Sequence, residues 1–278
     1  MWEVCDTAPK IGSLIRADKA TLLSGVRAGE IRDLLEQRGV LVFRGAGLSD
    51  AEQIEFTKTL GTFAHEKSEQ RAGQEGEDHV YPITMDTAIN PNADYLKGAF
   101  FWHIDGTMAQ VPIRASILSA RRLAAEGGDT EFCNTYAAWD DLPDDLKARC
   151  EGRQVIHSLW RSQLYHDPEP SYAKLQQWKS CGENTLPLVW THQSGRKSLV
   201  LGNTAQQVVG MDVSDSEDLM IRLRDWATSP QFTYRHKWEM GDTVIWDNTG
   251  TMHRATWYAV DSDRLMHRTK LEGEEAFA

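Results

Sequence analysis

The sequence lacks an excess of positive charge and any long apolar run. It has 30 lysines and arginines against 41 aspartates and glutamates, a formal net charge of −11 over 278 residues. This balance repels a phosphate backbone, so nucleic acids and anionic membranes are not expected partners. No stretch approaches the roughly 18 to 20 apolar residues of a membrane helix, and the first residues lack both segments of a signal peptide. We therefore expect a cytoplasmic protein.

Cysteine pairs, repeats and linkers are also missing. The four cysteines lie far apart and form no Cys-x-x-Cys pair, so neither a zinc knuckle nor a redox motif is indicated. No internal repeat, low-complexity tract or Pro/Gly/Ser-rich linker divides the chain. Residues 1–278 are therefore expected to form one domain.

Helical patterns occur at several places, including residues 143–150. Apolar residues at helical spacing predict a helix over residues 30–38 that ends at Gly39, followed by a buried strand at 40–43. Ser49 with Glu52 has the spacing of a capping box for a second helix. Ser214 with Glu217 has the same spacing ahead of a helix at 216–226.

Strand patterns dominate the second half. Apolar runs predict strands at 113–123 and 264–268, and residues 232–238 alternate before a turn at Gly241-Asp242 and a further strand at 243–246. No regular alternation of strands with long helices is present, which disfavours a Rossmann fold or a TIM barrel. We expect a mainly β fold, an antiparallel sandwich with helical insertions.

Residues 64–98 have a different composition. They hold glycine, asparagine, aspartate, proline and scattered charge, with one short apolar stretch at 80–83. Long ordered loops usually carry function. This segment is therefore a candidate substrate lid.

Three residues have the chemistry of a metal site. His103 and Asp105 are two apart, so an extended backbone places both on one side. His253 follows an apolar strand and is a natural third ligand. Two histidines and one carboxylate leave three positions of an octahedral ion open, as in non-haem Fe(II) oxygenases, so iron is favoured over zinc.

Two arginines follow the third candidate ligand. Arg264 and Arg268 have an even separation, so both face one side of a strand, while His267 faces the other. A buried guanidinium needs an anion, and its planar fork suits a carboxylate. The pair indicates two carboxylate-like groups, or one dianion, beside the metal.

These motifs, in this order, resemble the taurine dioxygenase and 2,4-dichlorophenoxyacetate dioxygenase (TauD/TfdA) family of Fe(II)/2-oxoglutarate-dependent oxygenases. The resemblance spans nearly the whole chain and rests on Gly39-Val-Leu-Val-Phe-Arg-Gly45, Trp102-His-Ile-Asp105, Gly127-Gly-Asp-Thr130, Trp246-Asp-Asn248, His253, Arg264 and Met266-His-Arg268.

The resemblance implies a double-stranded β-helix, or jelly roll, with Fe(II), 2-oxoglutarate and dioxygen as cofactor and co-substrates. It implies that His103, Asp105 and His253 are catalytic residues that bind the iron. Thr130 and Arg264 would bind the distal carboxylate of 2-oxoglutarate. The expected reaction hydroxylates a small-molecule substrate and releases succinate and CO2.

The expected substrate is an anionic, partly apolar acid. Arg268 matches the arginine that holds the substrate anion in relatives, and His65 lies near a loop histidine with a similar role. The Gly98-Ala-Phe-Phe101 segment is apolar where the taurine-specific pattern is polar, so Phe101 suits the wall of a site for an aryloxyalkanoate, a sulfonate or a related acid.

Two alternatives stay open from the sequence. The same iron centre could carry out desaturation, cyclisation or oxidative cleavage in a biosynthetic pathway. The chain could instead be a non-catalytic jelly-roll protein that binds metal or ligand. A homo-oligomer is expected from the family.

Overall fold

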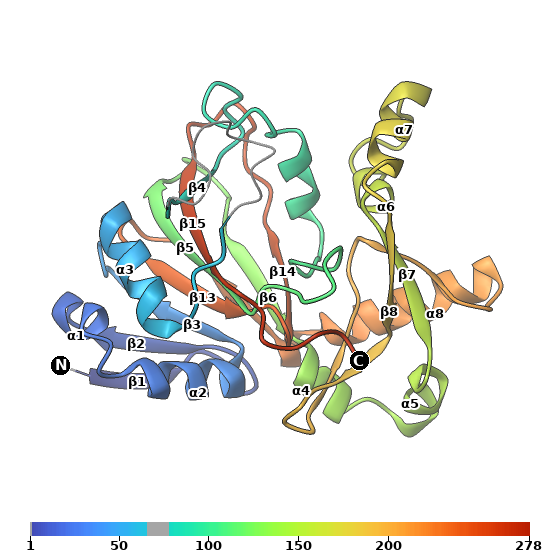
Figure 1. Ribbon diagram of the computed structural model, residues 1–278, viewed down its shortest axis with the longest axis horizontal. Coiled ribbons are helices and arrows are strands. Elements are labelled where there is room, and N and C mark those ends of the chain that lie inside the picture. The colour runs from blue at the N-terminus through green and yellow to red at the C-terminus, as the bar shows by residue number, and fades with distance from the viewer. Residues whose placement is uncertain (1, 66–77) are drawn as a thin grey trace.

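Two β-sheets face each other across an apolar interior (Figure 1). The computed structural model describes residues 2–65 and 78–278. In this part of the chain the larger, major sheet has seven strands in the order β1-β2-β3-β13-β5-β15-β4. They are β1 (Trp2–Asp6), β2 (Ser13–Ala17), β3 (Val40–Phe43), β4 (Tyr81–Ile83), β5 (Ala115–Arg122), β13 (Thr243–Asp247) and β15 (Leu265–Leu271). Only the β2–β3 pair among these is parallel.

The smaller, minor sheet has the order β12-β6-β14 in the described chain. Its strands are β6 (Thr130–Asn134), β12 (Thr233–His236) and β14 (Thr251–Ala255), all antiparallel. Phe132 of this sheet packs with Val42, Leu118 and Val244 of the major sheet. Side chains of both sheets therefore build one interior, as a jelly roll requires.

Helices cover the outer face of the major sheet. Figure 1 shows α1 (Lys19–Leu23), α2 (Ala28–Arg38) and α3 (Asp50–Leu60) on this side. Ile31, Leu35 and Phe56 pack here against Leu41 and Phe43 of β3. Burial of these side chains stabilises the outer face of the major sheet, and the other face of the sheet lines the interior.

An insertion between β6 and β12 covers the outer face of the minor sheet. In it Leu219 and Leu223 of α8 pack with Cys133 and Met252, which point outward from the minor sheet. Its helices are α4 (Thr135–Asp140), α5 (Asp144–Cys150), α6 (Leu159–Gln163), α7 (Tyr172–Lys179), α8 (Val213–Ala227) and the short η3 (Pro230–Phe232). Its strands are β7 (Gln154–Ser158), β8 (Glu183–Pro187), β9 (Val189–Thr191), β10 (Lys197–Leu199) and β11 (Ala205–Val208).

The predicted mainly β jelly roll with helical insertions is confirmed. The helix expected at 30–38 ends at Gly39, whose φ of 72° closes it in the left-handed region that glycine adopts without strain. The capping box of Ser49 and Glu52 is also present.

The second capping box is wrong. Asp212, not Ser214, caps α8, because its extended backbone lets its carboxylate accept from the Ser214 backbone N–H. Glu217 pairs with Arg161 of α6 instead. The spacing of serine and glutamate was correct, but an acidic residue two positions earlier already satisfied the helix start.

The turn at Gly241-Asp242 links two sheets. The strands on either side of it, β12 and β13, do not pair with each other. β12 pairs with β6 in the minor sheet, whereas β13 lies between β3 and β5 in the major sheet. An alternating pattern predicts strands but does not specify their partners.

The segment expected as a lid is described in part. Residues 66–77 lie outside the described residues. The described part contains β4, which pairs with β15, and η2 (Tyr95–Phe100), whose Gly98 carbonyl accepts from Asn203 at 2.9 Å. A lid at 64–98 and a single domain over 1–278 stay predictions.

Among the described helices, none combines the length and the apolar character needed to cross a membrane.

The burial of His157 in β7 should make the stability of the fold decrease at acidic pH. It is fully buried, and burial lowers its pKa to about 3. The unfolded chain therefore takes up this proton below about pH 6.5 while the folded chain does not, so stability falls as pH drops. His157→Gln should remove about 2 kcal/mol of the stability loss between pH 6.5 and pH 4.5, measured by urea unfolding at each pH. The exposed His65→Gln is the control. Parallel pH profiles for wild type and His157→Gln would contradict this.

Candidate metal centre

The backbones of His103 and His253 bond directly to each other. The His103 N–H donates to the His253 carbonyl at 3.0 Å, and the His253 N–H donates to the His103 carbonyl at 2.9 Å. His253 lies in β14, and His103 lies in the loop between η2 and β5. The loop thereby extends the edge of the minor sheet, which places the two imidazole rings 4.1 Å apart.

Asp105 completes a group of three. His103 Nε2 lies 3.8 Å from Asp105 Oδ1, and His253 Nε2 lies 3.9 Å from Asp105 Oδ2. One potential ligand atom from each residue lies within 4.8 Å of the others, and in residues 2–65 and 78–278 no second such group of His, Cys, Asp or Glu occurs. The three predicted ligands are thus brought together.

The protonation states suit a cation. Burial, then the neighbouring His103, lowers the pKa of His253 well below its usual value, so its imidazole is neutral. Burial alone would raise the pKa of Asp105, but the positive charge of Arg268 and a hydrogen bond from Ser116 help to hold it well below its usual range. The His103 Nδ1 lies 2.9 Å from the Phe101 carbonyl, which fixes it as the donor and leaves Nε2 facing Asp105. Two imidazoles and one carboxylate fit a divalent metal.

Arg264 lies buried next to the Gly127-Gly128-Asp129-Thr130 segment. Its Nη2 donates to the Gly128 carbonyl at 3.0 Å, and its guanidinium lies 4.7 Å from the centre of the Tyr258 ring. Its Nε has no hydrogen-bond partner among the described residues. Thr130, also buried, accepts from Trp238 Nε1 at 3.0 Å. A buried cation whose Nε lacks such a partner fits an anionic ligand such as 2-oxoglutarate.

Arg268 lies beside the group of three. Its Nη1 is 3.6 Å from Asp105 Oδ2. The register of β15 on β4 places Arg268 opposite Tyr81, with the guanidinium 5.4 Å from the ring centre. His267 points away, to Asp50 of α3 at 2.7 Å, as the strand parity predicts. The arginine and tyrosine thus form one cationic and aromatic surface next to the metal group.

Two predicted substrate residues contact groups outside the metal site. His65 is about half exposed, with its Nε2 3.7 Å from Asp78 and its ring 5.5 Å from Phe63. The Phe101 ring packs 5.1 Å from Tyr165. Their substrate roles stay predictions.

Sequence reasoning missed three residues around the group. Ser116 donates to Asp105, Asn248 donates to Ser116, and Tyr81 lies against Arg268. Asn248 stood in a recognised motif without a role, and the other two needed the strand pairing. Only a reliable register would have placed them.

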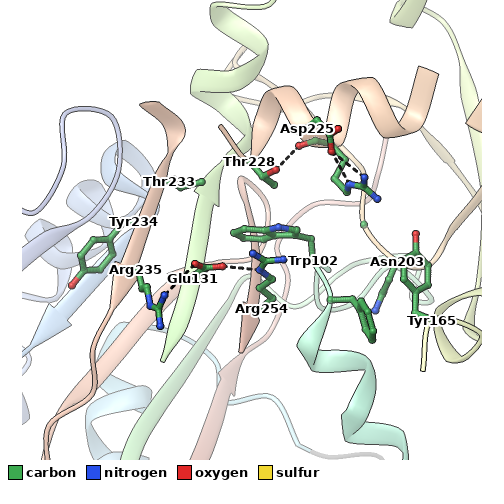
Figure 2. A pocket seen from close by; sticks show the side chains of 13 residues that line it. Trp102, Glu131, Tyr165, Asn203, Asp225, Thr228, Thr233, Tyr234, Arg235 and Arg254 are labelled. Atoms are coloured by element: carbon green, nitrogen blue, oxygen red, sulfur yellow. Dashed lines mark hydrogen bonds and ion pairs between the residues drawn. The ribbon is translucent and has the colours of Figure 1, made fainter. Parts of the chain in front are cut away.

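A cavity of about 360 Å³ lies on the other side of the minor sheet (Figure 2). Arg254 crosses it, 4.8 Å from the Trp102 ring and bonded to Glu131 at 2.7 Å. Trp102 and Arg254 are chain neighbours of His103 and His253 but point away from them, because side chains alternate across a strand. Its arginines, 224, 235 and 254, each have a carboxylate partner, so the cavity carries no free positive charge.

A jelly roll that brings two histidines and an aspartate together is typical of non-haem Fe(II) oxygenases. A model of the family described as taurine catabolism dioxygenase TauD, TfdA family matches residues 6–270, and the chain belongs to that family. The resemblance read from the motifs is confirmed.

Similar proteins of known activity and similar solved structures support the same family assignment. The alpha-ketoglutarate-dependent 2,4-dichlorophenoxyacetate dioxygenase of Burkholderia sp. (strain RASC) is 34% identical over 273 residues, 93% of this chain and 91% of the relative. The alpha-ketoglutarate-dependent sulfate ester dioxygenase of Pseudomonas putida is 32% identical over 98% of this chain and 90% of its own. The crystal structure of AAD-2 in complex with Mn(II) and N-oxalylglycine matches with a TM-score of 0.82 and 29% identity, covering 100% of both chains.

The chain is therefore a 2-oxoglutarate-dependent dioxygenase that requires Fe(II), 2-oxoglutarate and dioxygen.

A substitution at Gly128 tests how firmly Arg264 is held in its position. A Cβ at this position would lie 2.8 Å from Arg264 Nε, and its φ is +74°. Gly152 has a φ of +70°, and nothing lies within 4 Å of the point that a Cβ would occupy there. Both alanine variants lose about 1–2 kcal/mol to backbone strain, and Gly128→Ala should lose about 1–3 kcal/mol more by displacing the buried arginine. Chemical unfolding measures the difference, and equal losses would show that Arg264 yields freely.

Proposed function

We propose that this dioxygenase hydroxylates a small anionic, partly apolar organic acid, with His103, Asp105 and His253 as its iron ligands. The meeting of these three side chains within 4.8 Å carries the proposal. When bound, Fe(II) and 2-oxoglutarate supply the oxidising chemistry, in which dioxygen is consumed, succinate and CO2 are released, and one oxygen atom enters a substrate C–H bond. Three protein ligands would leave positions of a bound ion free for these co-substrates.

Thr130 and Arg264 are proposed to hold the distal carboxylate of 2-oxoglutarate. The partnerless Nε of Arg264 and its burial support this role, because a buried guanidinium is stabilised by a charged acceptor. The Thr130 hydroxyl, which accepts from Trp238, keeps its own hydrogen available to donate to that carboxylate.

Arg268 is proposed to hold the substrate anion. Its distance of 3.6 Å from Asp105 keeps a bound anion next to the metal, and the Tyr81 ring beside it offers an apolar face. Relatives named for 2,4-dichlorophenoxyacetate, phenoxypropionate and sulfate esters support an aryloxyalkanoate, sulfonate or sulfate ester as the class. The residues thus orient the substrate and neutralise its charge.

Other reactions of the iron centre would use the same residues. Analysis of products separates desaturation, cyclisation or oxidative cleavage from hydroxylation. A non-catalytic binding protein is disfavoured by the family and its enzymatic relatives. The cytoplasmic location and the homo-oligomer stay predictions.

The iron assignment predicts the effect of removing the carboxylate. Asp105→Ala should abolish turnover and the visible charge-transfer band that forms when Fe(II)-loaded protein is titrated with 2-oxoglutarate without oxygen, because one of three ligands is lost. Absorption spectroscopy and succinate release measure both. Asp263→Ala, at an exposed carboxylate, is the control and should keep both. Wild-type turnover in Asp105→Ala would refute the ligand set.

The substrate assignment predicts a selective loss. Arg268→Gln should raise KM for anionic substrates about 10- to 100-fold, the value of a charge-assisted hydrogen bond, while the charge-transfer band with 2-oxoglutarate still forms. A panel of aryloxyalkanoates, sulfonates and alkyl sulfates identifies the class by which member shifts the band of the wild type. Arg122→Gln, at the exposed end of β5, is the control. An unchanged KM across the panel in Arg268→Gln would exclude its proposed role.

A further inference from the structure

We propose that Ser116 and Asn248 are positioning residues that hold the Asp105 carboxylate so that it binds the metal through one oxygen. This inference rests on the proposed role of Asp105 as an iron ligand. It concerns two residues that touch neither metal nor substrate and act through the carboxylate.

A two-step hydrogen-bond chain supports the carboxylate. Ser116 Oγ donates to Asp105 Oδ2 at 3.0 Å, and Asn248 Nδ2 donates to Ser116 Oγ at 3.0 Å. Ser116 is fully buried and Asn248 is 1% exposed. Solvent therefore does not compete for these bonds.

The direction of the chain follows from its chemistry. An ionised carboxylate can only accept hydrogen bonds, so the Ser116 hydroxyl hydrogen must point to Asp105. The hydroxyl oxygen is then free to accept, and the amide nitrogen of Asn248 can only donate to it. Ser116 has a single hydroxyl hydrogen, so the bond to Asp105 uses its whole donor capacity while its oxygen accepts from Asn248.

The backbone around Asn248 holds its side chain in place. The Asn248 N–H donates to the Arg114 carbonyl at 2.8 Å. The next residue, Thr249, donates its N–H and hydroxyl to Asp247 at 2.9 and 2.6 Å. Asn248 Oδ1 has no hydrogen-bond partner among the described residues. Burying an amide oxygen without a hydrogen bond costs stability. The amide nitrogen makes its bond to Ser116, which indicates that this residue is kept for the bond its nitrogen donates.

The chain makes the two oxygens of Asp105 unequal. Each oxygen faces one histidine, Oδ1 facing His103 Nε2 at 3.8 Å and Oδ2 facing His253 Nε2 at 3.9 Å. Only Oδ2 also receives the Ser116 bond and faces Arg268, at 3.6 Å. The oxygen engaged by donors is the weaker metal ligand. A carboxylate held in this way offers Oδ1 alone, and a position that a second oxygen would occupy stays open for a co-substrate.

The same strand supplies a matched control. Ser119 is also buried in β5, but it faces the opposite side of the sheet, where its hydroxyl lies 2.8 Å from the Thr243 hydroxyl. Ser119→Ala removes the same group at the same burial from the same strand. It therefore measures the cost to the fold without affecting Asp105.

The test compares metal binding by the full chain. Mn(II) titration by calorimetry should give a dissociation constant about 10- to 100-fold weaker for Ser116→Ala than for wild type, and within twofold of wild type for Ser119→Ala. The absorption of the Co(II)-loaded protein should change in Ser116→Ala, because a freed carboxylate alters the coordination number. Ser116→Thr, which keeps the hydroxyl, should restore Mn(II) affinity.

Asn248→Asp is the second variant, in case Ser116→Ala does not fold. It replaces the donor with an acceptor of the same size, which draws the Ser116 hydrogen away from Asp105, and should also weaken Mn(II) binding. Mn(II) affinity within twofold of wild type in both Ser116→Ala and Asn248→Asp, or in the one that folds, would overturn the inference. A wild type that binds no Mn(II) would instead overturn the proposed iron site.

Discussion

The site depends on two backbone hydrogen bonds, those between His103 and His253. They attach a loop from the first half of the chain to β14, the edge strand of the minor sheet, which comes from the C-terminal part of the chain. Asp105, two residues further on, leaves this edge and reaches Ser116 in the major sheet. The metal group is therefore held from both sheets. Its geometry follows from the packing of Phe132 against Trp246 and the rest of the interior, which sets how the two sheets face each other.

Charge balance in the interior favours anionic ligands at this centre, which supports the proposed acidic substrate. Asp105 is the negative group of the metal site, and Arg268 lies against it. Arg264 is more deeply buried, donates to the Gly128 carbonyl and lies against the Tyr258 ring. Burying a guanidinium without an anion is costly, so an anionic ligand completes the interior electrostatically. The dicarboxylate co-substrate and the proposed acidic substrate both have this charge, and the sheets place the two arginines where they could bind them.

Predictions from the sequence were correct where they depend on a single helix or strand. Gly39 ended α2 because the left-handed cap depends on that residue and its preceding turn alone. The parity of Arg268 and His267 held because alternation is a property of one strand. Ser214 failed as a cap because the helix begins at Val213, with Asp212 as its cap, so Ser214 already lies in the first turn. The turn at Gly241-Asp242 was recognised, but the exchange of sheets across it depends on partners far away in the chain.

Residue types and their order in the sequence indicated the family and its cofactors, and predicted the three metal ligands and the two arginines, since each metal-binding or anion-binding group carries its chemistry wherever it is placed. The tertiary structure decided which further groups touch them. Tyr81 meets Arg268 through the β4–β15 register, and Ser116 meets Asp105 because β5 turns that side chain inward opposite the metal loop. Such contacts join distant segments, and a shift of one residue in register would point each side chain to the other face of its sheet. Only the folded packing of both sheets selects one register.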